Sequence, residues 1–117
     1  MIDTKQLDNI KGYGHGWTHD VGHGEAPWDA PLPESITRAY AFVGAMNDLG
    51  IDHPPVLFSC DPWGIICAEM WNDPLKLVLY FDPEVDGYLK IFGPHMFKDI
   101  EDGQVDNLKE LVEWLTQ

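Results

Sequence analysis

Apolar and polar residues alternate most regularly between Leu75 and Phe81, in the most apolar run of the chain. Large apolar side chains occupy every second position, and Lys76, Val78 and Tyr80 fall between them. A period of two is typical of a β-strand with one buried face, and the run is too short for a helix of ordinary length. The pattern therefore predicts a strand over residues 75–81.

Three further short apolar runs, each bounded by turn residues, predict neighbouring strands. Prolines, glycines and acidic residues separate the runs, and the links between them are short. Consecutive strands with short links are typical of an antiparallel meander. The four predicted strands cover residues 56–60, 65–71, 75–81 and 88–92.

The acidic turn after residue 81 constrains how the last two strands pair. Leu79 and Phe81 share a face with Leu89 and Ile91 only if Phe81 pairs with Leu89 and Leu79 with Ile91. A shift by one residue would turn every side chain of a strand to the other face. This register requires an odd loop over residues 83–87 and leaves the acids of the turn at an exposed tip.

A period of three to four predicts helices on either side of the strands. The central helix begins near Pro33, which suits a first turn, and ends at Gly50, a natural C-cap. The first helix is expected to be capped by Asp3 together with Gln6. The apolar stripes are Leu7 and Ile10 in the helix over residues 3–11; Ile36, Ala39, Tyr40, Val43, Met46 and Leu49 in the central helix; and Leu108, Leu111, Val112 and Leu115, flanked by Trp114, in the last helix over about residues 104–116.

These elements predict a single α+β domain over residues 1–117. Residues 33–117 form its α-β-β-β-β-α body, a four-stranded antiparallel meander sheet with two helices packed on one face. Residues 1–32 supply the short helix and a long N-terminal loop rich in glycine and histidine. Five glycines between residues 12 and 24 rule out a stable helix or strand there, and loops of this length are often functional.

The charge balance is unusual, with 20 acidic residues, 7 basic residues and a formal net charge of −13. Arg38 is the only arginine. Because phosphate recognition favours the arginine fork and nucleic-acid binding needs a basic surface, we expect no direct binding to DNA, RNA or an anionic membrane. An acidic chain fits a basic protein partner or a cation, and it also fits high solubility alone.

The chain has features of a cytoplasmic protein with reduced cysteines. No stretch approaches the ~20 apolar residues of a membrane span, and the first residues lack the pattern of a secretory signal. Cys60 and Cys67 flank a predicted four-residue turn, with Cys60 opposite Ile65 and Cys67 opposite Phe58. The thiols would then share a face on a diagonal of roughly 7–8 Å, beyond easy disulfide reach. We expect free, mostly buried thiols.

Two groups of acidic residues are regularly spaced. Asp82, Glu84 and Asp86 alternate along the turn, roughly 6.6 Å apart if the segment is extended. The second group falls at steps of four, four and three on the predicted last helix, where neighbours lie about 5–6 Å apart. Both spacings are comparable with that of successive phosphates, so the carboxylates either imitate a nucleic-acid backbone or form an ordinary solvated surface. The second group is Asp102, Asp106, Glu110 and Glu113.

Two other patterns raise the question of a metal site. His15, His19 and His23 recur at steps of four beside acidic residues, and such ligands suit Zn, Ni or Cu. Steps of four align ligands only on a helix, which the glycines disfavour, so the loop either wraps a metal or holds none. The turn after residue 81 superficially resembles an EF-hand loop, but Gly93 stands where a bidentate glutamate is required. We predict no calcium site there.

Residues able to support catalysis are few. Neither Ser35 nor Ser59 lies in a nucleophile-elbow sequence, and no histidine is close in sequence to either cysteine. No glycine-rich loop joins a strand to a helix start, as phosphate binding would require. We therefore expect no catalytic residues, no cofactor and no enzymatic activity.

The chain resembles a group of small uncharacterised bacterial proteins. The likeness rests on Gly16 and Trp17 in a Gly-Trp-Asp-Gly-type loop, on residues 33–39 as a Pro-Glu-x-Ile-x-Arg-Ala helix, and on the strands that follow. The resemblance spans about residues 12–93 and implies the fold but no activity. In size and acidity the chain is also similar to phage anti-defence proteins such as anti-CRISPR inhibitors.

These observations lead us to expect a small, acidic, non-enzymatic interaction protein. It would bind and block a basic surface of a nucleic-acid-handling protein. The alternatives are a metal-binding or metal-responsive module built on the histidine loop and an acidic structural homodimer. The expected contact residues are Asp82, Glu84, Asp86, Asp102, Asp106, Glu110 and Glu113.

Overall fold

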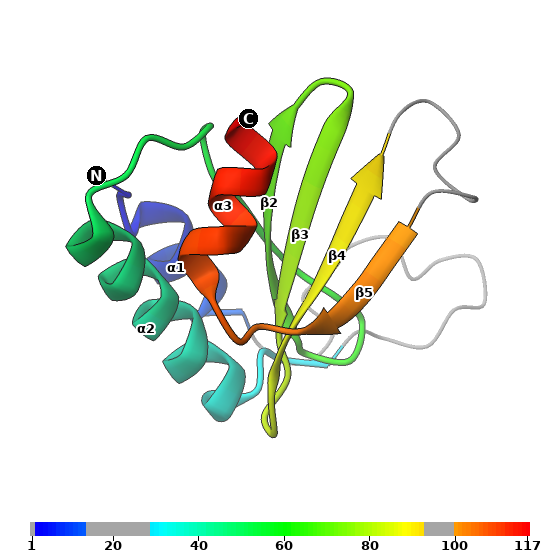
Figure 1. The fold of residues 1–117 in the computed structure, drawn as a ribbon. Helices are drawn as coiled ribbons and strands as arrows, with labels where there is room; N and C mark the ends of the chain where they lie inside the picture. Colours follow the sequence, from blue (N-terminus) through cyan, green and yellow to red (C-terminus); the bar gives the residue numbers. More distant parts are fainter. Residues whose placement is uncertain (1, 14–28, 93–99) are drawn as a thin grey trace.

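A computed structural model of the protein describes residues 2–13, 29–92 and 100–117. They form one five-stranded sheet with the helices packed on one of its faces (Figure 1). Neighbouring strands are antiparallel and follow the order of the chain, which confirms the α+β class and the meander. The elements are α1 (Lys5–Ile10), α2 (Pro33–Leu49), β1 (Leu57–Cys60), β2 (Ile66–Asn72), β3 (Leu75–Phe81), β4 (Asp86–Phe92), β5 (Ile100–Gln104) and α3 (Leu108–Thr116).

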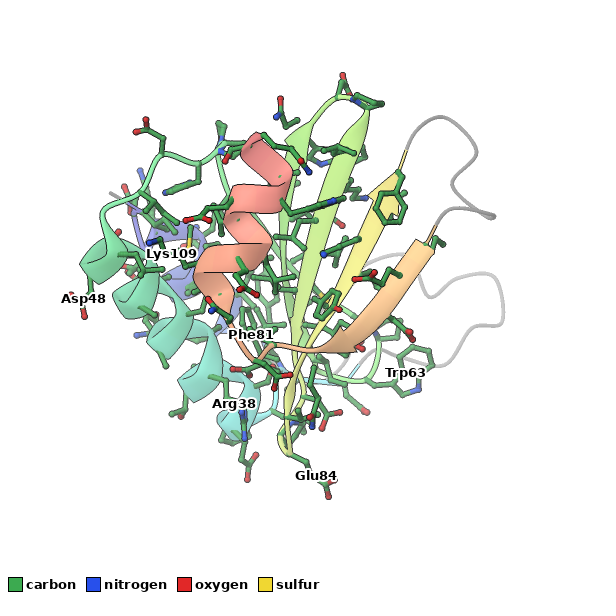
Figure 2. All side chains as sticks on the ribbon, in the orientation of Figure 1. Arg38, Asp48, Trp63, Phe81, Glu84 and Lys109 are labelled. Carbon is green, nitrogen blue, oxygen red and sulfur yellow. The ribbon has the colours of Figure 1, made fainter. Side chains whose placement is uncertain are left out.

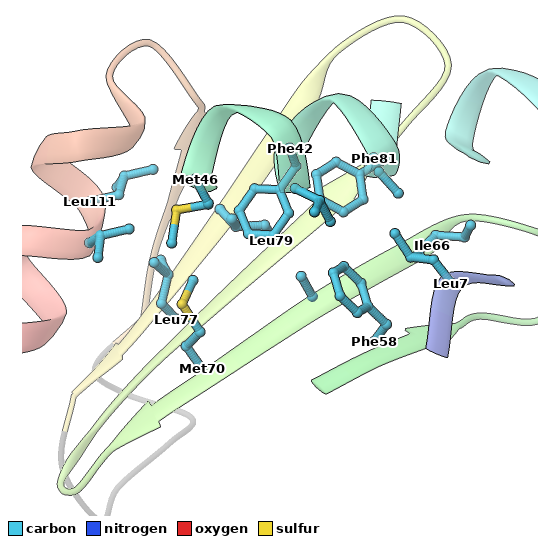
Figure 3. Packing of buried hydrophobic residues seen from close by; sticks show 14 of the residues in the cluster. Leu7, Phe42, Met46, Phe58, Ile66, Met70, Leu77, Leu79, Phe81 and Leu111 are labelled. Carbon is cyan, nitrogen blue, oxygen red and sulfur yellow. The ribbon is translucent and has the colours of Figure 1, made fainter. Parts of the chain in front are cut away.

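The core lies between the sheet and the helices, and β3 supplies its centre. Leu77, Leu79 and Phe81 are almost fully buried, as the period of two predicts. Phe81 packs on Phe42 of α2, with the ring centroids 5.4 Å apart (Figure 3). The other large side chains that are almost fully buried are Leu7, Met46, Ile66, Met70, Val112 and Leu115.

The predicted limits of α2 are confirmed, and two residues of its buried face, Ser35 and Phe42, were missed. Gly50 caps the helix with a φ of 61°, a left-handed conformation that glycine adopts without strain. Phe42 lies three residues after Ala39 and four before Met46, so it belongs to the buried face of the helix. Leu49, expected in that face, is 38% exposed. Among the described residues, no helix has both the length and the apolar composition needed to cross a bilayer.

The short helix α1 is confirmed, but its predicted cap is wrong. Thr4 occupies the N-cap position, but its Oγ1 donates to the Asp8 carboxylate at 3.3 Å and forms no capping bond to the helix backbone. The Asp3 carboxylate accepts a hydrogen bond from the Lys5 N–H at 2.7 Å. The Gln6 side chain reaches β1 instead, where its Oε1 accepts from the Phe58 N–H at 3.0 Å. That N–H points away from β2, so the glutamine satisfies a donor on the edge of the sheet.

The sequence pattern predicts no strand after residue 92, and β5 is therefore a correction. Its residues, Ile-Glu-Asp-Gly-Gln, include types that are depleted in strands. The strand forms by pairing with β4, where Gly103 lies opposite Tyr88. A Cβ at Gly103 would come within 3.0 Å of the tyrosine ring, so the ring packs where a side chain would otherwise stand. Because β5 and its link use residues 100–107, α3 begins later than predicted, at Leu108.

The predicted pairing of β3 with β4 is also wrong. Phe81 pairs with Asp86 and Leu79 with Tyr88, so the turn holds four residues, an even number. The turn is shorter than predicted because Asp86 is already the first residue of β4 and pairs with Phe81. Leu89 consequently points to the face of the sheet opposite the helices.

This register places Lys90 on the helix side of the sheet, whereas the predicted odd loop places it on the other side. Lys90 is tolerated because it lies at the margin of α3 and not in the centre of the core. Its ammonium group is 5.1 Å from the Trp114 ring centroid and 3.3 Å from the Glu101 carboxylate. The aliphatic stem is thus covered while the charge remains paired at the surface.

The two cysteines lie on opposite faces of the sheet. Cys60 pairs with Ile66 and not with Ile65, because Asp61 closes the turn by donating its N–H to the Ile65 carbonyl at 2.9 Å. Cys60 is buried on the helix side, and Cys67 is partly buried on the other side. The predicted shared face is therefore wrong, whereas both thiols are free as expected.

Candidate functional site

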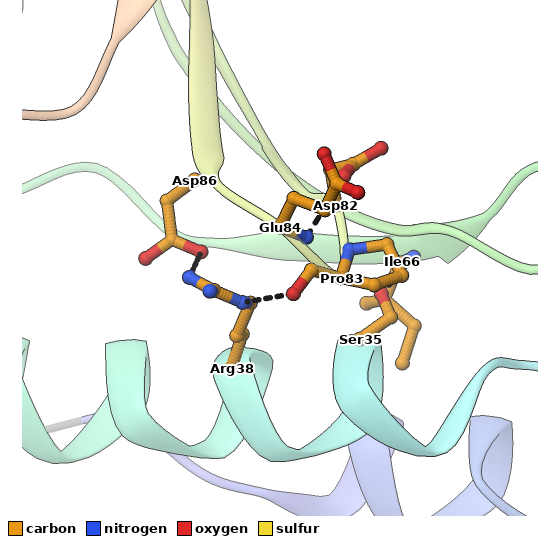
Figure 4. A network of polar contacts seen from close by, with 7 residues as sticks. All are labelled: Ser35, Arg38, Ile66, Asp82, Pro83, Glu84 and Asp86. Atoms are coloured by element: carbon orange, nitrogen blue, oxygen red, sulfur yellow. Dashed lines mark hydrogen bonds and ion pairs between the residues drawn. The ribbon is translucent and has the colours of Figure 1, made fainter.

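The β3–β4 turn is held against α2 by the arginine side chain. Arg38 donates from Nε to the carbonyl oxygen of Pro83 at 3.2 Å, and its Nη1 lies 3.2 Å from Oδ1 of Asp86 (Figure 4). Within the turn, the Asp82 carboxylate accepts a hydrogen bond of 3.0 Å from the Glu84 N–H. The turn is tight and not extended, so the even spacing predicted for its three acids is wrong. Asp86 is neutralised by the arginine, while Glu84 is exposed.

The link from β5 to α3 returns to the same end of the sheet. Val105 donates its N–H to the Asp86 carbonyl at 2.8 Å, which places the link beside the first residue of β4. Asn107 then caps α3, because its Oδ1 accepts from the Glu110 N–H at 3.2 Å. Asp106 and Glu110 are both exposed there. Figure 1 shows the β3–β4 turn, the arrowhead of β5 and the start of α3 at one end of the molecule.

The predicted row of four carboxylates on the last helix is wrong. Only Glu110 and Glu113 lie on α3. Asp106 belongs to the link, and Asp102 lies in β5 with its side chain on the sheet face opposite the helices. The sequence pattern failed because pairing with β4 keeps residues 100–104 out of the helix. The acids approach the β3–β4 turn through the fold and not through helical periodicity.

Most of the described basic side chains are already paired with acids. Two of the seven expected contact residues, Asp86 and Glu113, are neutralised in this way. Within the described ranges, the other five form no ion pair. The observed pairs are Lys11–Asp8, Arg38–Asp86, Lys76–Glu69, Lys90–Glu101 and Lys109–Glu113.

We refer to the surface formed by Glu34, Asp82, Glu84, Asp106 and Glu110 as the acidic end. Glu34 lies in the first turn of α2 and is exposed there. Sequence reasoning missed it, because no spacing links it to the other acids and only the fold brings the start of α2 to the β3–β4 turn. Figure 2 shows Glu84 at this end and Asp48 at the opposite end of α2. Charges of one sign gathered in this way create a field that attracts cationic groups.

A small polar cavity of about 170 Å³ lies between β4 and α3, beside the acidic end. Asp106 and Glu110 form part of its wall, and Tyr88 lines it. The Tyr88 hydroxyl donates to the Glu101 carboxylate at 3.0 Å, and this hydrogen bond raises the pKa of Tyr88 and lowers that of Glu101. The tyrosine is therefore protonated and the glutamate ionised at neutral pH. The cavity offers polar and acidic groups to a ligand. The pKa shifts of Tyr88 and Glu101 stabilise their ordinary protonation states and do not favour a role in proton transfer.

The larger groove, of about 590 Å³, separates α1 from β1. Ser59 and Cys60 lie on its wall, and burial raises the pKa of the Cys60 thiol to about 11. A thiol with that pKa carries almost no thiolate at neutral pH. Ser35 is equally unsuited to nucleophilic attack, because it is fully buried and its Oγ accepts the Ile66 N–H at 2.8 Å.

The metal-binding alternative stays a prediction, because His15, His19 and His23 lie outside the described residues. Within the described part of the chain, no group of three or more histidine, cysteine, aspartate or glutamate side chains is placed to hold a metal ion. His53 places its Nδ1 2.7 Å from the Pro54 carbonyl oxygen, a local backbone contact.

Comparison of the chain with models of protein families, with curated proteins and with solved structures found no match. The resemblance to small bacterial proteins and to anti-defence inhibitors therefore stays a prediction. The function is therefore inferred from the acidic end itself, that is, from the charges and contacts of its described residues.

Proposed function

We propose that the protein is a non-enzymatic inhibitor whose acidic end occupies a basic, nucleic-acid-binding surface of another protein. The observation that carries this proposal is the gathering of acidic side chains at one end of the fold, where none of the five residues of the acidic end forms an ion pair within the described part of the chain. A net charge of −13 adds a long-range field that steers the chain toward a basic partner and away from nucleic acid itself.

The acidic end is also held in place before binding. Arg38 ties the β3–β4 turn to α2, and the Val105–Asp86 hydrogen bond ties the start of α3 to that turn. Carboxylates held on anchored turns lose little further freedom on binding, which favours affinity. Because their spacing is irregular, the acids would act through the density and placement of charge and not by copying a row of phosphates.

The proposal is tested first by identifying the partner and then by measuring the complex. The tagged protein captures partners from a lysate of its host at about 50 mM and about 500 mM salt, since salt screens exposed charges. The partner is then purified, and its affinity for the protein is measured with and without its nucleic acid. We expect binding to weaken by at least tenfold across that salt range and nucleic acid to compete.

Charge reversal locates the contact. Asp106→Lys combined with Glu110→Lys should weaken binding by at least tenfold, whereas Asp48→Lys combined with Asp52→Lys makes the same change in net charge away from the acidic end and should have a much smaller effect. Thermal melting of both double variants checks that they fold. Binding that is insensitive to salt, or equal losses in the two variants, would overturn the proposal.

A further inference from the structure

The two edges of the sheet differ in how their backbone groups are used. At the β1 edge, the outward N–H of Phe58 donates to Gln6, so α1 satisfies a backbone donor on that side. At the other edge, β5 neighbours only β4, and four of its five residues are exposed. No described residue forms a hydrogen bond with the outer side of the β5 backbone. An exposed strand edge of this kind is a template for another strand.

The pairing with β4 shows which backbone groups of β5 point outward. In an antiparallel pair, residues that exchange hydrogen bonds with the partner strand alternate with residues that do not. Val105 donates to Asp86, so the residues at even steps before it, Gly103 and Glu101, bond to β4. The N–H and C=O groups of Ile100, Asp102 and Gln104 therefore face away from the sheet.

The side chains of these residues share one face of the edge. Ile100 is 47% exposed, and Asp102 is exposed and forms no ion pair within the described residues. The neighbouring Glu101 points to the opposite face, where Tyr88 and Lys90 already occupy its carboxylate. A strand laid along β5 would thus meet an open carboxylate and an open aliphatic group two residues apart.

We infer that β5 is a docking edge for an extended basic segment of the partner, which adds to the sheet as a sixth strand. The segment carries a lysine or arginine opposite Asp102 and an aliphatic residue, two positions away, opposite Ile100. Main-chain hydrogen bonds to the outward groups of β5 provide the affinity, and these two side chains provide the specificity. The inference rests on the proposed function in one respect, that the partner is basic.

Charge complementarity selects this occupant over a second copy of the chain. Pairing two β5 strands would bring the carboxylates of Glu101 and Asp102 against those of the other copy, and like charges on paired strands are destabilising. Each copy also carries a net charge of −13. A basic strand meets the opposite situation, since the end of β5 leads to the acidic end through Asp106.

The first test uses a synthetic peptide of about seven residues, the length of an ordinary strand. Every second residue of the peptide is threonine, and the positions between the threonines alternate between arginine and isoleucine. A matched control peptide has glutamate in place of each arginine. Titration followed by fluorescence anisotropy should show binding of the arginine peptide at least tenfold tighter than of the glutamate peptide.

Backbone pairing is then tested on the unmodified protein with N-methylated peptides. Only one set of alternate amides in an added strand points to β5, so N-methylation of that set should weaken binding at least tenfold while the other set has little effect. The sensitive set also gives the orientation: the arginine and isoleucine positions for antiparallel addition, the threonine positions for parallel addition. Loss with both sets, or with neither, would overturn the inference.

A matched pair of protein variants separates this inference from the proposed function. Gln104→Pro removes an outward N–H without changing charge, and proline is tolerated at such edge positions; Gln104→Thr keeps the N–H. We expect at least tenfold weaker peptide binding for the first variant only. If reversal at Asp106 and Glu110 weakens partner binding while Gln104→Pro leaves it unchanged, strand addition is wrong and the acidic end stands. If Gln104→Pro weakens partner binding while reversal at Asp106 and Glu110 and a change of salt have no effect, strand addition stands and the proposed function is wrong.

Discussion

The buried contact between Ser35 and β2 makes a sharp prediction about how α2 is joined to the sheet. Ser35 and Ile66 are both fully buried, and the serine Oγ accepts the isoleucine N–H at 2.8 Å. Ser35→Ala removes that acceptor, and a buried donor without a partner costs about 1–3 kcal/mol. Alanine has the higher helix propensity, by up to about 0.5 kcal/mol, which offsets part of the loss. We therefore expect Ser35→Ala to lower the free energy of unfolding by about 1–2 kcal/mol.

The chain offers its own control, because its other serine, Ser59, is exposed in β1. Ser59→Ala should change the free energy of unfolding by less than about 0.5 kcal/mol. Urea unfolding followed by tryptophan fluorescence measures both variants, and thermal melting should place Ser35→Ala about 3–10 °C below the wild type. If the two serine variants were equally stable, the hydrogen bond to β2 would contribute nothing and the reasoning would fail.

Three further predictions concern the core, the start of α3 and the cysteines. Leu79→Ala should lower the free energy of unfolding by about 2–5 kcal/mol, whereas Leu57→Ala at an exposed position of β1 should have little effect; similar losses in urea titrations would contradict the assigned core. Asn107→Ala should lower it by about 1 kcal/mol through loss of the helix cap, and Asn107→Asp should restore most of that stability. Burial raises the pKa of Cys60 to about 11 and that of Cys67 to about 12, so Ellman's reagent at about pH 8 should react at least tenfold more slowly with the folded than with the urea-unfolded protein. Equal rates in the two states would show that the thiols are not protected.

Local patterns in the sequence predicted the helices and strands that have one regularly buried face. The buried alternation of β3 and the limits of α2 follow from periodicity, proline and glycine, which are properties of neighbouring residues. The strand β5 has no such signal, because it consists mostly of acidic, glycine and glutamine residues and has no buried alternation. Within the described residues, it is paired with β4 on one side only. The strand forms by pairing with β4, where Tyr88 packs over Gly103, a contact that no local pattern contains.

The register of β3 with β4 shows where the sequence argument failed in physical terms. A lysine on the helix side is unexpected, because a charge in a core is costly. Lys90 nevertheless lies on that side, since its stem is covered at the margin of α3 and its ammonium group reaches Trp114 and Glu101. The side of a sheet that faces helices is not uniformly buried, and residues near its open edge tolerate amphipathic side chains.

The candidate site was anticipated by residue type more than by geometry. Asp82, Glu84, Asp106 and Glu110 were selected for regular spacings that the fold does not retain, and Glu34 was not selected. They come together because Arg38 and the Val105 N–H both attach to the first residue of β4. Long-range contacts of this kind bring separate acids to one end, and no spacing rule within the sequence can reveal them.

The acidic end and the β5 edge would act on different steps of binding. Exposed carboxylates such as Asp106 act over a distance and are screened by salt, so they mainly set the association rate. Main-chain hydrogen bonds to β5 form only after the strand is seated, so they mainly set the dissociation rate. Two sites with these roles explain how a strongly acidic surface, attractive to many basic proteins, could still retain one of them. The electrostatic field of the acidic end attracts basic proteins, and the β5 edge slows the dissociation of the one whose extended segment pairs with it.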